Sequence, residues 1–174
     1  MPKLSLFAQI HAGFTEKLFC ATYKTPFLVV YKGEIPAGEQ KSDRGFETTA
    51  VALGRVLQGL RDQDPEVYGL AEARQIGMTT VGRAPNNDIV LASDTISKFH
   101  AYFKKTATDE YAVADAGSRN GTRVNGIQIH RHSPQILKGG ELIEFARTFR
   151  AAYHTPESLF RLIALRDRLG SAAR

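Results

Sequence analysis

The sequence has a single cysteine, no tryptophan and no long apolar run. Cys20 cannot form a disulfide within the chain, so we expect a reducing, cytoplasmic setting in which Cys20 fills part of the core. The apolar run Phe27–Tyr31 is far shorter than the roughly 18–20 residues that a membrane-spanning helix needs. No long apolar stretch and no small-residue cleavage site follow Met1, which argues against a secretory leader. The sequence therefore predicts a cytoplasmic protein that does not cross a membrane.

The usual catalytic and metal-binding patterns are also missing. The sequence contains no nucleophile elbow, no phosphate-binding loop ending in Lys-Ser or Lys-Thr, no His-Glu-x-x-His and no cysteine pair. His130 and His132 flank a cation, Arg131, and have no third ligand, which disfavours a metal site. Ser97 and His100 could act as nucleophile and base, but no orienting group or oxyanion motif accompanies them. We therefore expect no catalysis, no cofactor and no metal.

The overall amino-acid composition is that of an ordinary globular protein with an excess of basic residues. The chain has 174 residues, of which 43% are hydrophobic and 24% charged, and this suits one domain with short extensions. A formal net charge of +5 favours acidic or phosphorylated partners. The excess is spread along the chain, and its densest runs are Lys104-Lys105 and the arginines 161, 166 and 168. Because nucleic-acid-binding proteins usually gather basic residues on one stripe, nucleic acid is the least favoured partner.

Both ends of the chain are predicted to be helical. Apolar residues at three- and four-residue spacing between Leu6 and Leu18 predict one amphipathic helix over about residues 3–22, although Gly13 weakens it. Near the other end, Thr155 offers a capping hydroxyl before Pro156 at the first helical position, and Gly170 is expected to end the helix. Residues 46–60 fit either a helix or a strand and turn, and the sequence leaves this choice open.

The middle of the chain is a series of short β-type segments separated by turn residues. The hairpin signal is strongest at Asn125-Gly126, because both residues tolerate the positive φ that a type I′ turn requires. Lys138–Glu141 predicts a tight reversal. Many short strands without helices between them predict a mainly β protein, a sandwich or barrel. The predicted strands are Phe27–Tyr31, Val67–Leu70, Met78–Val81, Ile89–Leu91, Ala101–Phe103, Tyr111–Ala114, Ile127–Ile129, Leu142–Phe145 and Thr148–Tyr153.

Small polar and basic residues recur in the predicted loops in a definite order. The order is Gly82-Arg83, Ser97-Lys98-Phe99-His100, Asn120-Gly121-Thr122 and Asn125-Gly126. With these motifs the sequence resembles the forkhead-associated (FHA) domain, a β-sandwich module that binds phosphothreonine peptides. The motif-bearing resemblance covers about residues 66–153. It implies an FHA-type (SMAD/FHA-like) β-sandwich of about 10–11 strands at residues 25–154, with a helical extension at 1–24 and a C-terminal helix at 155–174.

The resemblance also implies how a phosphopeptide would be held. A phosphothreonine carries roughly −1.5 to −2 charges and three strong acceptor oxygens, so its receptor needs a fixed cation and neutral donors. By resemblance, Arg83, Ser97 and Lys98 meet the phosphate, and Asn120 holds the peptide main chain with Arg119 beside it. Family members often carry Arg where this chain has Lys98, and a small hydroxyl residue where it has Arg119. The change at Arg119 is expected to favour a more acidic peptide.

Other motif residues are expected to support the binding loops rather than contact the ligand. By resemblance these are Gly82, His100, Gly121 and Thr122. Thr95 lies on the loop with which family members read a residue beyond the phosphothreonine, and nothing in the sequence predicts which residue is preferred.

The function that the resemblance implies is non-catalytic recognition of phosphothreonine-containing partner proteins in signalling by an upstream Ser/Thr protein kinase, with no membrane or nucleic-acid partner. Two alternatives stay open: a phosphate-independent protein–protein interaction scaffold that uses the sandwich surface or the terminal helices and, less favoured, nucleic-acid binding. Thr48 and Thr49 add a further hypothesis: either one, once phosphorylated, could dock into the pocket of a second copy.

Overall fold

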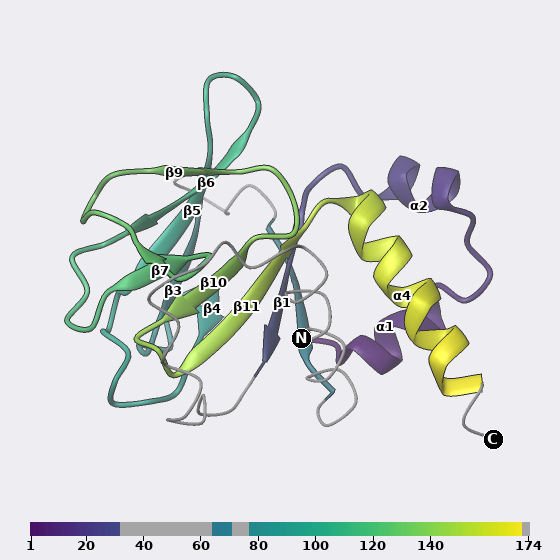
Figure 1. Cartoon of the computed structure of the whole chain (residues 1–174), viewed down its shortest axis with the longest axis horizontal. Helices are drawn as coiled ribbons and strands as arrows, with labels where there is room; N and C mark the ends of the chain where they lie inside the picture. Colours follow the sequence, from purple (N-terminus) through teal and green to yellow (C-terminus); the bar gives the residue numbers. More distant parts are fainter. Residues whose placement is uncertain (32–63, 71–76, 172–174) are drawn as a thin grey trace.

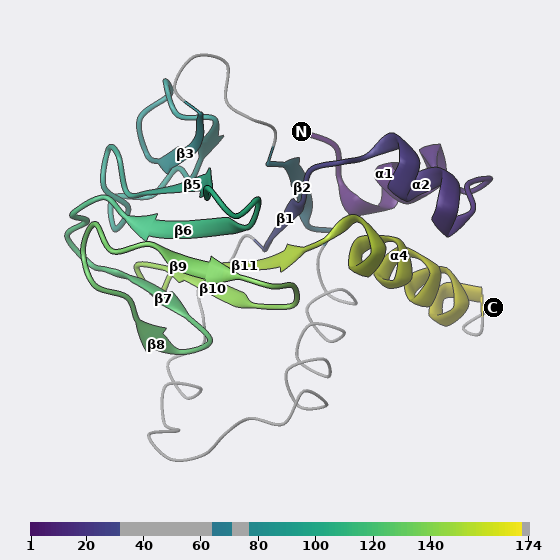
Figure 2. The same cartoon turned by 90° about the horizontal axis from the view of Figure 1, so that it is seen from above.

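The computed structural model of the chain describes residues 1–31, 64–70 and 77–171. Within them, two β-sheets face each other, and helices gather at one end (Figures 1 and 2). The six-stranded sheet has the order β2-β1-β11-β10-β7-β8, and the five-stranded sheet has the order β4-β3-β5-β6-β9. This arrangement confirms the predicted β-sandwich, to which the described residues contribute eleven strands.

The strand bounds agree with the predicted segments to within about two residues, and all assigned strand pairs except β3–β4 are antiparallel. Sequence patterning missed β7, which directly follows the Asn120-Gly121 motif, and β9, in which only Leu137 is buried. The strands are β1 (Phe27–Tyr31), β2 (Glu66–Gly69), β3 (Met78–Gly82), β4 (Ile89–Val90), β5 (Ala101–Lys105), β6 (Tyr111–Asp115), β7 (Thr122–Val124), β8 (Ile127–Gln128), β9 (Gln135–Leu137), β10 (Leu142–Phe145) and β11 (Phe149–His154).

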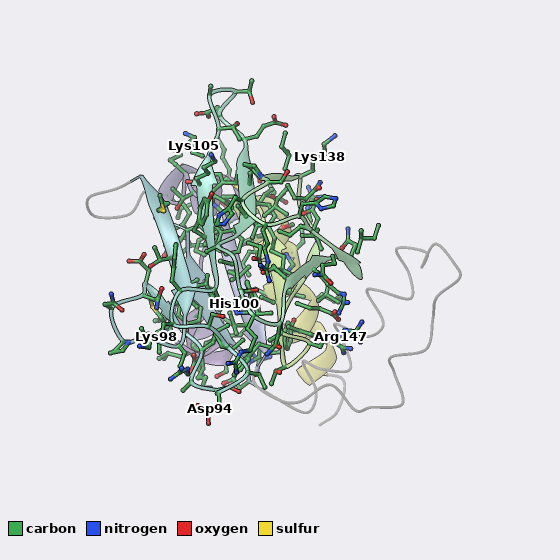
Figure 3. The ribbon with its side chains drawn as sticks, turned by 90° about the vertical axis from the view of Figure 1, so that its left-hand side faces the viewer. Asp94, Lys98, His100, Lys105, Lys138 and Arg147 are labelled. Carbon is green, nitrogen blue, oxygen red and sulfur yellow. The ribbon has the colours of Figure 1, made fainter. Side chains whose placement is uncertain are left out.

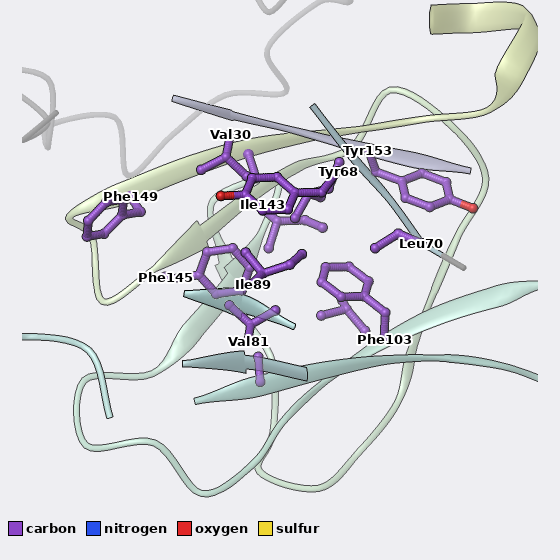
Figure 4. Packing of buried hydrophobic residues seen from close by; sticks show 14 of the residues in the cluster. Val30, Tyr68, Leu70, Val81, Ile89, Phe103, Ile143, Phe145, Phe149 and Tyr153 are labelled. Carbon is purple, nitrogen blue, oxygen red and sulfur yellow. The ribbon is translucent and has the colours of Figure 1, made fainter. Parts of the chain in front are cut away.

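The main core fills the space between the two sheets. Ten of the eleven described strands contribute side chains to it, and Phe103 of β5 lies in the same cluster as Ile143 and Phe145 of β10 (Figure 4). These side chains are almost completely removed from water. Burial of one such side chain stabilises the fold by about 1.5–3 kcal/mol, and the core therefore gives the loops at the sandwich ends a rigid base.

Two of the predicted turns have the expected backbone. Asn125 and Gly126 have φ values of 51° and 81°, and they join Val124 of β7 to Ile127 of β8 as a type I′ hairpin requires. Gly139 and Gly140, in the reversal before β10, also have positive φ. The hairpin prediction is confirmed, and the segment predicted as a tight reversal connects β9 of one sheet to β10 of the other.

The prediction of one N-terminal helix over residues 3–22 is wrong. The structure has two helices, α1 (Leu4–Ile10) and α2 (Glu16–Thr22). The chain turns after His11, and Thr15 restarts the helix as an N-cap whose Oγ1 accepts the backbone N–H of Leu18 at 3.2 Å. Apolar spacing alone did not reveal the break, because both short helices keep a helical period.

The three helices of the described residues cover the outer face of β1 and β2 and enclose a second core. Its side chains include Phe7 of α1, Phe19 of α2 and Leu159 of α4 (Pro156–Ser171), packed against Phe27 and Val67. Cys20 is only half-buried and lies outside both cores, so its prediction as core filler is wrong. The neighbouring Phe19 takes the inward position on α2, and the next residue on a helix points about 100° away.

The C-terminal helix begins as predicted and ends later. Thr155 caps it, with its Oγ1 accepting the backbone N–H of Ser158 at 3.3 Å. The helix continues through Gly170 to Ser171, so the predicted stop is wrong. A glycine costs about 1 kcal/mol inside a helix, which is too little to end one by itself.

Some predictions have no structural test. Residues 46–60, with Thr48 and Thr49, lie outside the described residues, and the division into segments 1–24, 25–154 and 155–174 stays a prediction. None of the helices in the described ranges is both long and apolar enough to span a bilayer.

Candidate functional site

Three loops that carry the predicted site residues meet at one end of the sandwich. They are the β3–β4 loop (residues 83–88), the β4–β5 loop (91–100) and the β6–β7 loop (116–121). The backbone N–H of Arg83 donates to the carbonyl oxygen of Ser97 at 2.9 Å, and that of Arg119 donates to Ser97 Oγ at 3.0 Å. Ser97 therefore joins all three loops. These loops carry the predicted site residues Arg83, Ser97, Lys98, Arg119 and Asn120.

Arg83 is anchored at one point and free at its tip. Its Nε donates to the carbonyl oxygen of Ile96 at 3.2 Å, which fixes the direction of the side chain. The residue is exposed, and its two terminal nitrogens have no partner within the described part of the chain. A guanidinium held in this way keeps a planar pair of donors available to an anion.

Ser97 and Lys98 add two further donors beside it. Because Ser97 Oγ accepts the N–H of Arg119, its own proton points elsewhere, and no acceptor for that proton exists in residues 1–31, 64–70 or 77–171. The Lys98 backbone is held by Asn87, whose Nδ2 donates to the Lys98 carbonyl oxygen at 2.7 Å. The ammonium group of Lys98 is exposed at the loop end of the molecule (Figure 3).

Asn120 ties the β6–β7 loop to the β4–β5 loop. Its Nδ2 donates to the carbonyl oxygen of Thr95 at 2.7 Å. This bond fixes the carboxamide and leaves Oδ1 and one N–H for a ligand. Thr95 Oγ1 in turn lies 3.0 Å from the Oγ1 of Thr148, which follows β10. The β10–β11 turn (residues 146–148) is therefore a fourth segment of the site, and sequence analysis missed it.

His100 braces two of the loops from beneath. It is completely buried, its Nδ1 accepts the Ser97 N–H at 3.2 Å, and its Nε2 lies 3.2 Å from the Gly121 carbonyl oxygen. Since the carbonyl can only accept, the proton is on Nε2. Burial lowers the pKa of His100 below its usual value, although the Gly121 carbonyl and Asp115 act in the opposite direction. The geometry agrees with the supporting role implied by the resemblance.

Two of the motif glycines are required by close approaches. A Cβ atom at Gly82 would lie 2.3 Å from the carbonyl oxygen of Lys98, which is too close for any side chain. Gly121 has a φ of +78°, and a Cβ there would meet the side chain of Gln128 at 2.9 Å. Gly82 therefore lets two loop backbones pack closely, and Gly121 leaves room for the Gln128 side chain.

Asp115 is a second buried support, and sequence analysis did not single it out. Its carboxylate accepts hydrogen bonds from the Gly117 and Ser118 N–H groups and from the hydroxyls of Ser118 and Thr122, at 2.6–2.9 Å. Burial opposes ionisation, but these four hydrogen bonds outweigh it and lower the pKa of the Asp115 carboxyl. The spacing Asp-x-x-Ser after a strand is an Asx-turn signal that could have identified it. Thr122, one of the predicted supports, donates its hydroxyl to this carboxylate.

The arrangement of charged and neutral donors suits anion binding. The site presents cationic and neutral donors from Arg83, Ser97 and Lys98, and its buried carboxylate, Asp115, is saturated with donors. Within the described ranges, no group of three or more His, Cys, Asp or Glu side chains is placed to hold a metal ion.

Comparison with known proteins gives a family match over part of the chain. The family model described as "FHA domain" matches residues 79–146. The oxoglutarate dehydrogenase inhibitor of Corynebacterium jeikeium is 37% identical over 75 residues, which are 43% of this chain and 49% of that protein. The glycogen accumulation regulator GarA of Mycobacterium tuberculosis is 35% identical over 78 residues, 45% of each chain. This chain therefore spans about half the length of the curated relatives that it matches.

Solved structures with a similar fold include FHA domains. Mycobacterium tuberculosis EmbR in complex with a low-affinity phosphopeptide matches with a TM-score of 0.44 and 24% identity, over 72% of this chain and 24% of that one. The MEK1 FHA domain in complex with a HOP1 phosphothreonine peptide has a TM-score of 0.45 and 26% identity, over 51% and 87%. From the family match and its own two-sheet architecture, the chain contains an FHA domain, whose matched part is residues 79–146.

Proposed function

We propose that this FHA domain binds phosphothreonine-containing segments of partner proteins through Arg83, Ser97 and Lys98. The observation that carries the proposal is the meeting of three donors on joined loops, with N–H or O–H groups that have no partner among the residues described. A phosphothreonine at neutral pH carries about −1.5 to −2 charges and three acceptor oxygens. Three donors, two of them cationic, match this group in charge and in number.

Each side chain would contribute in its own way. Arg83 is already held through Nε, so it loses less freedom on binding and can offer its terminal nitrogens to two phosphate oxygens. The Ser97 hydroxyl, whose oxygen is occupied by the Arg119 N–H, would donate its proton to a third. Lys98 would approach as a mobile point charge.

Asn120 would hold the peptide main chain next to the phosphothreonine. An extended peptide has unsatisfied N–H and C=O groups, and the remaining Oδ1 and N–H of Asn120 are complementary to one of each. Arg119 has a fixed backbone and an exposed side chain, so it would reach the phosphate or a neighbouring acidic side chain.

The function would be binding without catalysis. The relatives are named as an inhibitor and a regulator, roles that a binding module can fill by occupying a surface of its partner. We infer that this chain likewise acts on a partner protein once a Ser/Thr kinase has phosphorylated it. The partner would be recognised by its phosphothreonine and by the residues around it.

The experiment is capture of a degenerate phosphothreonine peptide library, with phosphoserine and unphosphorylated versions as competitors. Arg83→Ala should lower the affinity by about tenfold to a hundredfold, because a hydrogen bond to a charged group contributes about 1.5–3 kcal/mol. Lys138→Ala is the matched control, since Lys138 is exposed at the opposite end of the sandwich (Figure 3). Absence of capture by folded wild-type protein, or an equal affinity of Arg83→Ala, would contradict the proposal.

The pH dependence of binding gives an independent test. The second pKa of a phosphothreonine is near 6, so the affinity should decrease as the pH falls from about 7.5 to 5.5. Circular dichroism at both pH values checks that the protein stays folded. An affinity that does not change over this range would argue against a dianionic ligand.

A second candidate function, a phosphate-independent scaffold, has its own support in the exposed apolar side chains of the first two helices. Leu6 and Ile10 of α1 are 49% and 60% exposed, and Leu18 of α2 is 49% exposed. If this surface binds the partner, Ile10→Glu should abolish partner binding and Arg83→Ala should leave it unchanged. If the phosphopeptide function is correct, Arg83→Ala should weaken partner binding and Ile10→Glu should leave it unchanged.

A further inference from the structure

The β10–β11 turn holds an arginine in a backbone conformation that arginine rarely adopts. Ala146 and Arg147 have φ values of 55° and 57°, both in the left-handed region. Glycine and asparagine adopt this region at lower cost, and they are the residues that usually occupy such turns. Backbone strain of this kind persists where the fold imposes it, and it often marks a functional position.

The same turn is bonded on both sides to the loops of the candidate site. The backbone N–H of Ala146 donates to the carbonyl oxygen of Gly121 at 3.0 Å, which links the turn to the β6–β7 loop. Thr148 Oγ1 lies 3.0 Å from Thr95 Oγ1, which links it to the β4–β5 loop. Thr95 also accepts the carboxamide of Asn120 through its carbonyl oxygen. Arg147 is therefore one residue away from each of two contacts with the peptide-binding loops.

Arg147 is a cation without a counter-charge in the part of the chain that is described. It is exposed, and no carboxylate there pairs with it. By contrast, Arg150 on the following strand is half-buried, and its Nε lies 3.5 Å from Glu144 Oε1. Figure 3 shows Arg147 at the same end of the sandwich as Lys98 and Asp94. Asp94 is the acidic residue labelled at that end, and it forms no ion pair with Arg147.

We propose that Arg147 forms a second anion subsite, which binds an acidic group of the partner peptide at a distance from the phosphothreonine. This inference rests on the proposed function, and it names a class of ligand: a phosphothreonine segment with a second negative group. That group is a carboxylate of Asp or Glu or a second phosphate. Both offer the paired oxygens that a guanidinium binds. The tethered turn holds Arg147 in place beside the loops while its side chain stays accessible.

The test uses the full chain and phosphothreonine peptides with neutral flanks, in which one Glu is placed at each flanking position in turn. Fluorescence anisotropy measures their affinities for wild type, Arg147→Asn and Lys138→Asn. Asparagine tolerates the left-handed backbone, so Arg147→Asn removes the charge and keeps the turn. Lys138→Asn removes one charge at the opposite end and serves as the matched control.

We expect Glu to strengthen binding to wild type in at least one position. For that peptide, Arg147→Asn should lower the affinity by about fivefold. The neutral-flank peptide should bind both proteins equally, and Lys138→Asn should behave as wild type. Arg147→Glu should turn the preference toward a Lys at the same position. In peptides where a second phosphothreonine replaces the Glu, the additional gain over the singly phosphorylated peptide should increase from pH 5.5 to 7.5, as the second phosphate becomes a dianion.

Three results would overturn the inference, and they differ from failure of the proposed function. If Arg147→Asn weakens neutral and acidic peptides equally, Arg147 acts on the turn or on the main phosphate site. If wild type binds all phosphothreonine peptides alike, or if Arg147→Asn keeps the preference for Glu, the second subsite does not exist. If wild type binds no phosphothreonine peptide at all, the proposed function itself fails and the inference fails with it.

Discussion

His154 should make the stability of the protein sensitive to mild acid. It is the last residue of β11, 8% exposed, and lies where the strand meets α4. Its Nδ1 is 3.1 Å from the Ser158 hydroxyl oxygen, and its Nε2 is buried with no hydrogen-bond partner among the described residues. Burial lowers the pKa of His154 to about 4. The folded protein therefore holds this imidazole neutral down to a pH at which an unfolded chain has already protonated it.

The sign and the size of the effect follow from this difference. As the pH falls below about 6.5, the unfolded chain binds a proton at His154 and the folded protein does not, so the free energy of unfolding decreases. The decrease is complete near the folded pKa of about 4 and amounts to about 3 kcal/mol. Since domains of this size are stable by about 5–15 kcal/mol, this one side chain removes a large share of the total.

Urea denaturation followed by circular dichroism, in steps from pH 7 to pH 4.5, measures the effect. His154→Phe has a ring of similar size and nothing to titrate, so its stability should fall less with pH than that of the wild type. Ser158→Ala removes the partner of Nδ1 but keeps the imidazole, and it should retain the wild-type pH dependence. Burial lowers the pKa of His100 as well. Wild type and His154→Phe both contain His100, so the difference between their pH dependences of stability reports His154 alone. An equal decline in wild type and His154→Phe would refute the reasoning.

Three further substitutions give predictions, two at supports of the site and one at the hairpin glycine Gly126. Gly82→Ala places a methyl group 2.3 Å from the Lys98 carbonyl oxygen, so it should cost about 1–3 kcal/mol in urea denaturation and also weaken phosphopeptide binding. Gly126→Ala meets no atom within 4 Å but keeps a φ of +81°, so it should cost about 1 kcal/mol and leave peptide affinity unchanged. Asp115→Asn should cost about 1.5–3 kcal/mol at pH 7. Because the folded pKa of Asp115 is lowered, its advantage over Asn should be full above about pH 4 and disappear as the pH falls through that lowered pKa.

The parts of the fold that follow from local pattern were predictable. Short β-type runs bounded by turn residues predicted β5 and β6, and Asn125-Gly126 predicted the hairpin, because strand and turn preferences depend on residues close in sequence. The break between α1 and α2 was missed because two short helices in succession keep nearly the same apolar spacing as one long helix. The end of α4 was placed too early because one glycine is a weak stop.

The candidate site was predictable only where its residues belong to local motifs. Arg83, Ser97, Lys98 and Asn120 stand in short motifs, and the structure brings their loops together. The contact between Thr95 and Thr148 joins residues 53 positions apart, and it depends on how β10 and β11 pair. No pattern within either segment predicts such a contact.

Charge shows most clearly what the fold adds to the sequence. The net charge of +5 is spread along the chain, and counting residues favours no surface. In the structure, several cations away from the site lie against carboxylates, as Arg161 does with Glu16 and Arg166 with Asp64. Arg83 and Arg147 stand on loops at one end and have no such partner in the described ranges. Since a paired cation contributes little to attracting a new anion, ion pairing makes Arg161 and Arg166 poor anion sites and leaves Arg83 and Arg147 available at the loop end.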